Sequence, residues 1–288
     1  MTDKPEAIFS GTKEVTEAHR FDEAKLAQWM EANVEGYAGP LEVRQFKGGQ
    51  SNPTYQLVTP NKKYVMRRKP PGKLLPSAHA VDREYRVITA LAETDVPVAK
   101  TYCLCEDTTI IGTAFYVMAC VEGRVMWDPT LPGHKATDRA AIFDAMNATI
   151  AALHSVDVDA VGLSDYGKPG NYFERQIARW TKQYQASETE TIEAMDKLIQ
   201  WLPANIPPGD EVSIVHGDYR LDNIMYHATE PRILAVLDWE LSTLGHPLAD
   251  FAYHCMTWHI PHGVFRGLAG IDLAGLGIPD EKDYVAKY

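Results

Sequence analysis

The sequence predicts an α+β fold of two lobes, with an antiparallel sheet and one main helix in the N-terminal lobe and a mostly helical C-terminal lobe. Short runs of alternating apolar and polar residues recur between residues 41 and 119, which is the pattern of half-buried strands. Helical apolar stripes dominate after residue 120. The chain has 288 residues, enough for two lobes of ordinary size around a substantial core.

Composition and charge narrow the classes of function. With 45% hydrophobic and 23% charged residues, the chain has the composition of a soluble globular protein. Its net charge of −11 argues against nucleic acid as a partner, because such surfaces need basic patches. No apolar run is long enough to span a membrane or to form a signal peptide, so we expect no membrane partner and a cytoplasmic location. The four cysteines lack C-x2-C spacing and are expected to be reduced thiols.

The N-terminal lobe is expected over residues 21–119, after a polar and weakly patterned stretch, 1–20, that we expect to be a mobile arm. Asp22 is placed to cap a helix, and a first strand follows from Leu41. The next stretch, KGGQSNPTY, lies between two strands. Glycines there let the backbone approach a phosphate, to which Ser51 and nearby amides can donate. An ordinary hairpin turn is the alternative.

The third strand, residues 64–69, supplies a cation. Alternation from Val65 directs Arg67 toward the space between the lobes. In the helix after Ser77, Glu84 shares the inward apolar face, and a carboxylate on such a face needs a cationic partner. We therefore expect Glu84 to pair with Arg67. The alternative is a surface pair with Arg83 or Arg86.

The C-terminal lobe is expected over residues 120–288. Thr137 is placed to cap a long helix, and two more helices are expected over residues 173–184 and 187–202, ended by Pro203. A short apolar run, a predicted strand, then precedes the sequence HGDYRLDN at residues 216–223. A second strand, 233–237, ends in Asp238.

Two polar motifs at these strand ends indicate chemistry. Asp218 and Asn223 lie five residues apart, as Asp and Asn do in the catalytic loop of kinases. There the carboxylate takes the proton of a hydroxyl and the amide oxygen holds magnesium. Asp238, at the tip of a buried strand, is a candidate second magnesium ligand. The alternative is a polar turn followed by an Asp that only caps a strand.

The motifs HGD-x4-N and LDWE resemble those of the aminoglycoside phosphotransferase and choline kinase superfamily, which are small-molecule kinases of the protein-kinase-like fold. The resemblance implies ATP and Mg2+ as cofactors. It implies Asp218 as the catalytic base, with Asn223 and Asp238 as the metal ligands. The stretch GG-x-SN-x-TY resembles the nucleotide loop of the superfamily, which adds the candidate nucleotide-binding residues Gly48, Gly49, Ser51 and Asn52 to Arg67 and Glu84.

The strand 115–119 and the glycine at 123 resemble the linker between kinase lobes, where backbone groups bind adenine. The backbone at Ala119 and Val121 would take that role. The chain departs from the usual pattern at Arg67, where most members carry Lys. Asp250 resembles a buried Asp that supports the catalytic loop, although an acid favoured by the helix dipole is the competing explanation.

The longer run of motifs, including RRKPPG at residues 67–72, resembles the kinase-like domain fused to some acyl-CoA dehydrogenases. That resemblance implies ATP-dependent phosphorylation of a small-molecule hydroxyl, with a hydroxyacyl compound as a better acceptor than an antibiotic. It also implies further helices after Tyr288, so we expect the C-terminus to be truncated.

Two other functions stay open. A nucleotide-binding pseudokinase that acts as an interaction module is favoured by the missing Lys, and disfavoured by the intact Asp218, Asn223 and Asp238. A metal-dependent hydrolase using the same acids would release phosphate without an acceptor. The sequence does not identify the acceptor, and it leaves a homodimer open.

Overall fold

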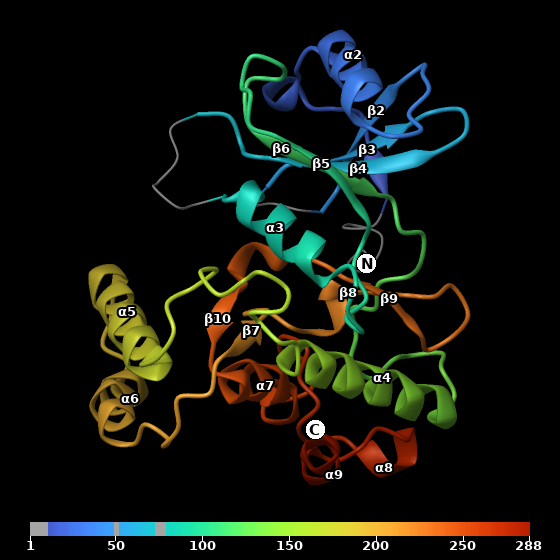
Figure 1. The fold of residues 1–288 in the computed structure, drawn as a ribbon. Helices are drawn as coiled ribbons and strands as arrows, with labels where there is room; N and C mark the ends of the chain where they lie inside the picture. Colours follow the sequence, from blue (N-terminus) through green and yellow to red (C-terminus); the bar gives the residue numbers. More distant parts are fainter. Residues whose placement is uncertain (1–10, 49–51, 73–78) are drawn as a thin grey trace.

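The N-terminal half of the chain is built on one antiparallel sheet, as predicted. The computed structural model describes residues 11–48, 52–72 and 79–288. Six strands pair in the order β1-β2-β3-β4-β6-β5, and every pairing is antiparallel. The strands of this sheet are β1 (Thr12–Lys13), β2 (Glu42–Phe46), β3 (Thr54–Val58), β4 (Lys63–Arg68), β5 (Thr101–Cys105) and β6 (Phe115–Ala119). Helix α2 (Glu23–Asn33) lies on the side of the sheet that faces away from the C-terminal half, and α3 (Val81–Leu91) lies between the sheet and the C-terminal half (Figure 1).

The C-terminal half is mostly helical and carries two small two-stranded sheets (Figure 1). One sheet pairs β7 with β10, and the other pairs β8 with β9. The elements of this half are α4 (Ala136–His154), α5 (Tyr172–Ser187), α6 (Glu193–Ala204), β7 (Ser213–Val215), β8 (Ile224–Tyr226), β9 (Ile233–Val236), β10 (Thr243–Gly245), α7 (Pro247–Cys255), α8 (Leu273–Leu276) and α9 (Glu281–Lys287). The division of the chain at residues 119 and 120 stays a prediction.

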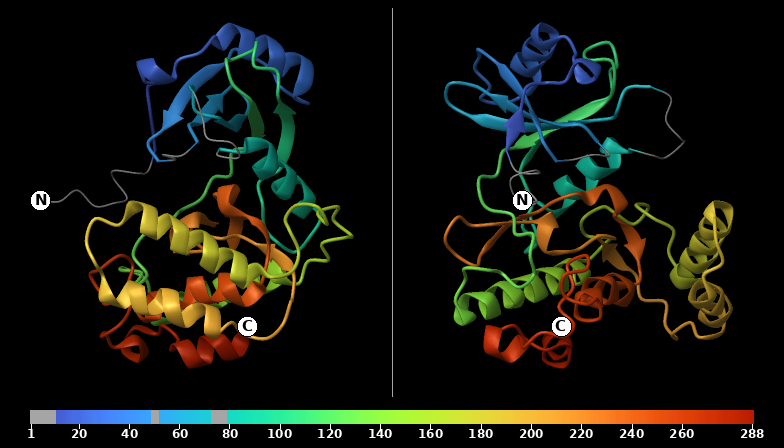
Figure 2. Two further views of the ribbon diagram at one scale, coloured as in Figure 1. Left: turned by 90° about the vertical axis from the view of Figure 1, so that its left-hand side faces the viewer. Right: turned by 180° about the vertical axis from the view of Figure 1, so that it is seen from behind.

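Helices α5 and α6 form a hairpin that stands away from the rest of the C-terminal half (Figures 1 and 2). Neither helix contains a buried residue, and Trp180 and Trp201 are 60% and 57% exposed. The hairpin therefore adds little to the core.

Several expected boundaries differ from the structure. Residues 12–19 were expected in a mobile arm, yet β1 pairs with β2, and the N–H of Thr16 donates to Gln45 Oε1 at 3.2 Å. A strand of two residues, such as β1, is too short to show a periodic pattern in the sequence. Residues 1–10 lie outside the described part of the chain.

Helix starts also differ. Asp22 caps α2 as predicted, because its carboxylate accepts from the N–H of Lys25 at 3.0 Å. Thr137 does not cap α4, which begins at Ala136. Helix α6 begins at Glu193, later than expected, and Pro203 lies inside its last turn. Element ends are the part of a sequence pattern that is least determined, since neighbouring caps compete.

The larger of two core clusters joins the two halves of the molecule. It includes Val81 and Ile88 of α3 together with Ile142 and Phe143 of α4. The smaller cluster lies between α2 and the sheet. Because α3 packs on the C-terminal half, its polar inward side chains are held at the boundary between the two halves.

All four cysteines are free, as expected from their spacing. Within residues 11–48, 52–72 and 79–288, none of the helices has the length and apolar character needed to cross a membrane.

An aromatic cluster at the end of α7 buries His254. The ring lies among Tyr219, Phe251, Trp258 and Tyr284, and its Nε2 lies 2.7 Å from Tyr284 Oη. Burial lowers the pKa of His254 to about 4, from an ordinary value of 6.5. The fold therefore holds the neutral imidazole.

We predict a pH-dependent loss of stability from His254. Between pH 6.5 and about 4 the unfolded chain binds a proton at His254 that the folded chain does not, so the free energy of unfolding falls as the pH drops through this window. The difference between the two pKa values corresponds to about 3 kcal/mol. Chemical denaturation of the wild type and His254→Gln at several pH values should show the gap in stability narrowing below pH 6.5. A gap that is constant with pH would contradict the prediction.

Candidate functional site

The loop of residues 216–223 follows β7 and is shaped by a glycine. Gly217 has a φ of +82°, and a Cβ there would lie 2.9 Å from the carbonyl oxygen of Leu241. Both conditions favour a residue without a side chain. The loop ends in a 3₁₀ turn at Leu221–Asn223. The turn brings Asn223 back beside Asp218.

Asp250 fixes the backbone of this loop through two hydrogen bonds. Its Oδ2 accepts from the N–H of His216 at 2.7 Å, and its Oδ1 accepts from the N–H of Gly217 at 2.9 Å. Burial opposes its charge, but the hydrogen bond from His154 and the neighbouring His216 keep the pKa of Asp250 below its ordinary value. The expected support of the loop by Asp250 is therefore present. A helix-dipole role alone would not require these bonds.

His154 continues the support. Its Nε2 lies 3.2 Å from Asp250 Oδ2, and its Nδ1 lies 2.6 Å from the hydroxyl of Tyr288. Tyr288 in turn stacks on Phe251 with ring centroids 3.8 Å apart. His154 thus connects the end of α4 to the loop of residues 216–223 through the carboxylate of Asp250.

Asp218 is held by three donors. Asn223 Nδ2 donates to its Oδ2 at 3.0 Å, and Arg220 Nη2 lies 3.1 Å from the same oxygen. The hydroxyl of Tyr253 donates to Oδ1 at 2.7 Å. Asn223 Nδ2 also donates to the carbonyl oxygen of Asp218 at 3.0 Å. These bonds use the amide nitrogen of Asn223 and leave its side-chain oxygen directed away from Asp218.

The loop and the second motif are joined through Leu237. Its N–H donates to the carbonyl oxygen of Asn223 at 2.8 Å, and its carbonyl oxygen lies 2.8 Å from His216 Nε2. Asp238 follows in the left-handed conformation, with φ +63° and ψ +61°. A non-glycine residue rarely takes this conformation, and it is typical of functional sites. The residues that the sequence predicted as metal ligands, Asn223 and Asp238, are therefore positioned by one short backbone contact.

Arg67 connects Asp238 to α3. Its Nε lies 2.9 Å from Glu84 Oε2, and its Nη2 lies 3.0 Å from Asp238 Oδ1. Glu240, which the sequence analysis did not single out, lies 3.8 Å from the same Nη2. The predicted pair of Arg67 and Glu84 is confirmed. The planar guanidinium reaches two carboxylates at once, which a lysine ammonium does less well.

Glu84 is almost fully buried and fully engaged. Asn52 Nδ2 donates to its Oε1 at 2.6 Å, and the hydroxyl of Tyr116 donates to Oε2 at 3.0 Å. Burial raises the pKa of Glu84, while the guanidinium of Arg67 and the Tyr116 hydroxyl act in the opposite direction. With these donors around it, the ionised carboxylate is the form that fits the site.

The surface alternative for Glu84 is wrong. Arg83 Nη2 donates to the carbonyl oxygen of Tyr166 at 2.7 Å, and Arg86 pairs with Asp165. Arg68, by contrast, is 2% exposed and lies over the ring of Phe21. The sequence analysis assigned Arg68 no such environment, because a charge at the end of an amphipathic strand gives no sign of an aromatic ring contributed from outside the sheet.

The nucleotide loop is only partly described. Gly49 and Ser51 lie outside the described residues, while Gly48 lies two residues after the end of β2 and Asn52 lies two residues before the start of β3. The side chain of Asn52 donates to Glu84, so it could contact a phosphate only while it keeps this hydrogen bond or by giving it up. The role of Gly48, Gly49 and Ser51 stays a prediction.

The expected linker is only partly available for adenine. The N–H of Ala119 already donates to the carbonyl oxygen of Lys100 at 2.7 Å, so a contact of the Ala119 backbone with adenine would have to use its carbonyl oxygen, and this role stays a prediction. Gly123 is required for packing, because a Cβ there would lie 2.2 Å from the carbonyl oxygen of Tyr226. A role for Val121 stays a prediction.

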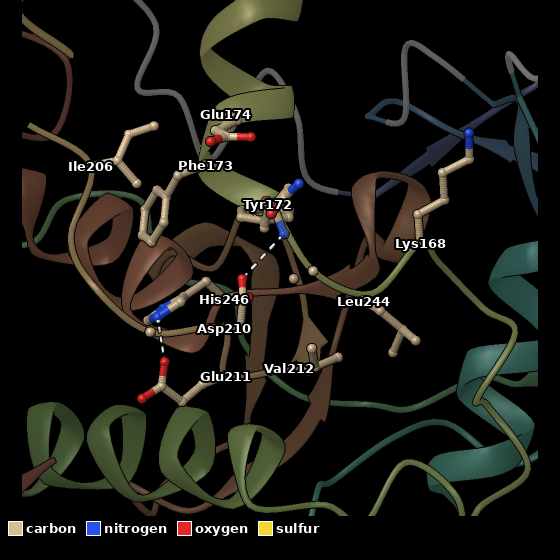
Figure 3. Close-up of a pocket in the computed structure, with 14 residues that line it drawn as sticks. Lys168, Tyr172, Phe173, Glu174, Ile206, Asp210, Glu211, Val212, Leu244 and His246 are labelled. Atoms are coloured by element: carbon tan, nitrogen blue, oxygen red, sulfur yellow. Dashed lines mark hydrogen bonds and ion pairs between the residues drawn. The ribbon is translucent and has the colours of Figure 1, made fainter. Parts of the chain in front are cut away.

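The described part of the C-terminal half contains two cavities that bear on the site. One, of about 50 Å³, adjoins the loop 216–223 at Arg220 and Leu221 and is lined by Tyr253, Ile260 and Phe265 among others. The other, of about 150 Å³, lies between α5 and the residues before β7. Figure 3 shows it with His246, whose Nε2 lies 3.0 Å from Glu211 Oε2. The larger cavity has no lining residue from the loop 216–223, so the smaller one is the candidate acceptor site.

The sequence analysis missed the charges that surround this smaller cavity. Asp222 is buried between Arg220, at 3.3 Å, and Arg266, at 2.5 Å. Arg266 lies 44 residues away, and Tyr253 lies 35 residues from the carboxylate that it contacts. No local pattern links residues so far apart. A weak signal was available for Arg220, which lies between Asp218 and Asn223 in the motif itself.

Comparison with known proteins identifies the family. A family model described as "Phosphotransferase enzyme family" matches residues 42–283. The chain belongs to this family. Its members in the solved structures share the fold: a protein of Ralstonia eutropha, provisionally described as an aminoglycoside phosphotransferase, is 64% identical, has a TM-score of 0.87, and the match covers 93% of this chain and 79% of that one.

More distant members show the fold alone. A thermostable mutant of the aminoglycoside phosphotransferase APH(4)-Ia, in a ternary complex with AMP-PNP and hygromycin B, is 17% identical. Its TM-score is 0.56, and the match covers 78% of this chain and 74% of that chain. The protein-kinase-like α+β fold expected of the phosphotransferase family is therefore confirmed.

Curated relatives include longer proteins. Acyl-CoA dehydrogenase family member 10 of Mus musculus is 49% identical over 252 residues, which is 87% of this chain and 24% of that protein. The chain spans about a quarter to a third of the length of the first curated relatives that it matches. The expected resemblance to the domain associated with acyl-CoA dehydrogenases is confirmed.

Removing the negative charge of Asp250 tests its support of the loop. In Asp250→Asn the amide offers one acceptor oxygen to two backbone donors, so one buried N–H of the loop 216–223 loses its partner. We expect a loss of about 2 kcal/mol in the free energy of unfolding. The matched control is Asp138→Asn, an exposed acid in the first turn of α4, which should change stability by less than about 0.5 kcal/mol. Equal losses in both variants, measured by urea denaturation, would reduce Asp250 to an acid favoured by the helix dipole.

Proposed function

We propose that this chain is an ATP- and magnesium-dependent kinase that phosphorylates a hydroxyl of a small molecule. The observation that carries the proposal is the connected set Asp218, Asn223 and Asp238, joined through Leu237 and bound to Arg67. Phosphoryl transfer demands little covalent chemistry from a protein, and positioning with charge neutralisation supplies most of the rate. Membership of the phosphotransferase family supports the reaction class.

Asp218 is proposed as the base that orients the acceptor hydroxyl and takes its proton. The donors on Oδ2, Asn223 and Arg220, fix the plane of the carboxylate. A general base must be held within hydrogen-bonding reach of the proton that it takes, and a fixed plane meets that need. Asp250, below the loop, keeps the backbone of the loop in place without touching the substrate.

Asn223 and Asp238 are proposed as the magnesium ligands. Each of these side chains carries an oxygen ligand, and Mg2+ prefers a few protein oxygens together with phosphate oxygens and water. Among the residues that the structure describes, no cluster of three or more His, Cys, Asp or Glu forms a cage for a metal, which agrees with a site shared with a nucleotide. When bound, the ion would neutralise charge on the phosphates.

Arg67 is proposed to bind the α- and β-phosphates in the place of the usual Lys. Glu84 fixes its Nε side, and the guanidinium has further N–H groups for phosphate oxygens. ATP as the donor is supported by the complex of the family member APH(4)-Ia with AMP-PNP. Cations on either side of a triphosphate lower the cost of bringing its charge to the carboxylate of Asp218.

The acceptor is proposed to be a hydroxyacyl compound. The small cavity beside Asp218 is lined mainly by apolar side chains, including Phe143, Met146 and Ile260. Such a lining suits an aliphatic body better than the several ammonium groups of an aminoglycoside, which would lose hydration without gaining partners. The likeness to acyl-CoA dehydrogenase family proteins points in the same direction.

A nucleotide-binding pseudokinase is the second candidate. The substitution of Arg67 for Lys favours it. The complete set of Asp218, Asn223 and Asp238, each held by specific contacts, is the observation against it, since binding alone does not require an oriented base.

Replacement of Asp218 by Asn separates the two candidates. We expect Asp218→Asn to bind Mg·ATP as the wild type does and to lose about 100-fold to 10,000-fold in turnover, which is the usual contribution of a general base. Nucleotide binding is measured by calorimetry and turnover by ADP release. The exposed Asp138→Asn is the matched control. Wild-type turnover in Asp218→Asn would remove this residue from its role.

Narrowing each cavity in turn tests the acceptor site. Ile260→Trp should fill the small cavity and raise the KM for hydroxy acids or hydroxyacyl compounds, with the KM for Mg·ATP unchanged. Val212→Trp places the same side chain in the larger cavity and is the control. A panel of hydroxy acids and aminoglycosides is assayed by ADP release. Sensitivity to Val212→Trp alone would move the acceptor to the larger cavity.

A further inference from the structure

The hydroxyl of Tyr253 donates a hydrogen bond to the carboxylate oxygen of Asp218 that Asn223 and Arg220 do not contact. Tyr253 lies on α7, and its Oη donates to Asp218 Oδ1 at 2.7 Å. Asn223 and Arg220 are both on Oδ2. Oδ1 therefore has one donor and is the oxygen left for an incoming hydroxyl. In the structure, that donor is a phenol from a separate element.

The phenol is neutral and stays so. Burial raises the pKa of Tyr253 to about 12, and the hydrogen bond to Asp218 adds to the rise. The ring is partly buried, and its other face lines the small cavity together with Phe143, Met256 and Ile260. Tyr253 thus stands between the cavity proposed for the acceptor and the carboxylate proposed as the base.

An unguarded base is a hazard for a kinase. Water at Asp218 would give its proton to Oδ1 and form a bond to the γ-phosphorus while the bond to the ADP oxygen breaks, so that ATP is hydrolysed to ADP and phosphate. An acceptor hydroxyl goes through the same steps and ends as a phosphate ester. The two reactions differ only in which O–H lies at Oδ1, so a group that holds Oδ1 decides between them.

We propose that Tyr253 is a positioning residue that holds Oδ1 of Asp218 against water and gives way to the acceptor hydroxyl. This inference rests on the proposed kinase function. The tyrosine donates a hydrogen bond and transfers no proton. A hydroxyl of the acceptor replaces the phenol as donor, so the number of hydrogen bonds to the carboxylate is conserved, whereas a water molecule alone has no apolar body to displace the ring from the cavity wall.

The test is ATP hydrolysis without an acceptor. Tyr253→Phe removes one oxygen and keeps the ring, so Oδ1 becomes open to water. We expect ADP release from Mg·ATP to rise about tenfold to 100-fold over the wild type, which is the range for the loss of one hydrogen bond to a carboxylate. Binding of Mg·ATP should not change. A purely structural role for Tyr253 would lower hydrolysis along with stability.

Three further variants make the result specific. Tyr37→Phe is the matched control, because its hydroxyl is buried without a hydrogen-bond partner in the described part of the chain and lies in the N-terminal half. Adding Asp218→Asn to Tyr253→Phe should abolish the rise. Tyr253→Leu also removes the aromatic ring from the wall of the small cavity and should raise hydrolysis at least as much as Tyr253→Phe. It replaces Tyr253→Phe in the test if that variant is unstable.

The outcomes distinguish this inference from the function on which it rests. Equal or lower hydrolysis in both Tyr253 variants, with Mg·ATP bound as in the wild type, overturns the guarding role and leaves the kinase proposal intact. A rise that persists in the double variant with Asp218→Asn also overturns it. If the wild type does not bind Mg·ATP, the proposed kinase function fails first.

Discussion

The site depends on one buried ion pair that reaches across the molecule. Arg67, on the sheet, is fixed by Glu84 on α3 and extends to Asp238 in the C-terminal half. Because Glu84 is 1% exposed, neither charge can be left without its partner at small cost. The pair therefore sets the distance between the sheet and the loops that follow β7 and β9, and the contacts of Asp218 and Asn223 are made within that frame.

Much of this arrangement could be predicted from the sequence. The alternation of β4 gave the direction of Arg67, and the helical period of α3 placed Glu84 on its inward face, so the pair itself followed from the pattern. The five-residue spacing singled out Asp218 and Asn223 as a pair of candidate site residues, and the bonds of Asn223 to Asp218 place the two side by side. Local periodicity was sufficient wherever both partners lay on regular elements whose faces were defined by burial.

The remainder depends on contacts that no local pattern encodes. Tyr253 and Arg266 contact the loop from segments far along the chain. In the sequence, nothing distinguishes them from any other tyrosine on a helix or arginine in a loop. The backbone of Ala119 gives a second example: its N–H donates to Lys100, and only the register of neighbouring segments reveals which backbone groups are already bonded. Both examples concern hydrogen bonds between separate segments of the chain, which the sequence determines only through the complete fold.

Tyr288 contacts His154, and His154 contacts Asp250. The geometry of the loop 216–223 therefore depends on residues that lie well away from the proposed ATP site. A substitution at position 154 or 288 changes the environment of a carboxylate that fixes two peptide groups of the loop. Selection for turnover should therefore act on these positions as well. Genetic drift at these distant positions would be limited by the geometry of Asp218, although neither side chain contacts it.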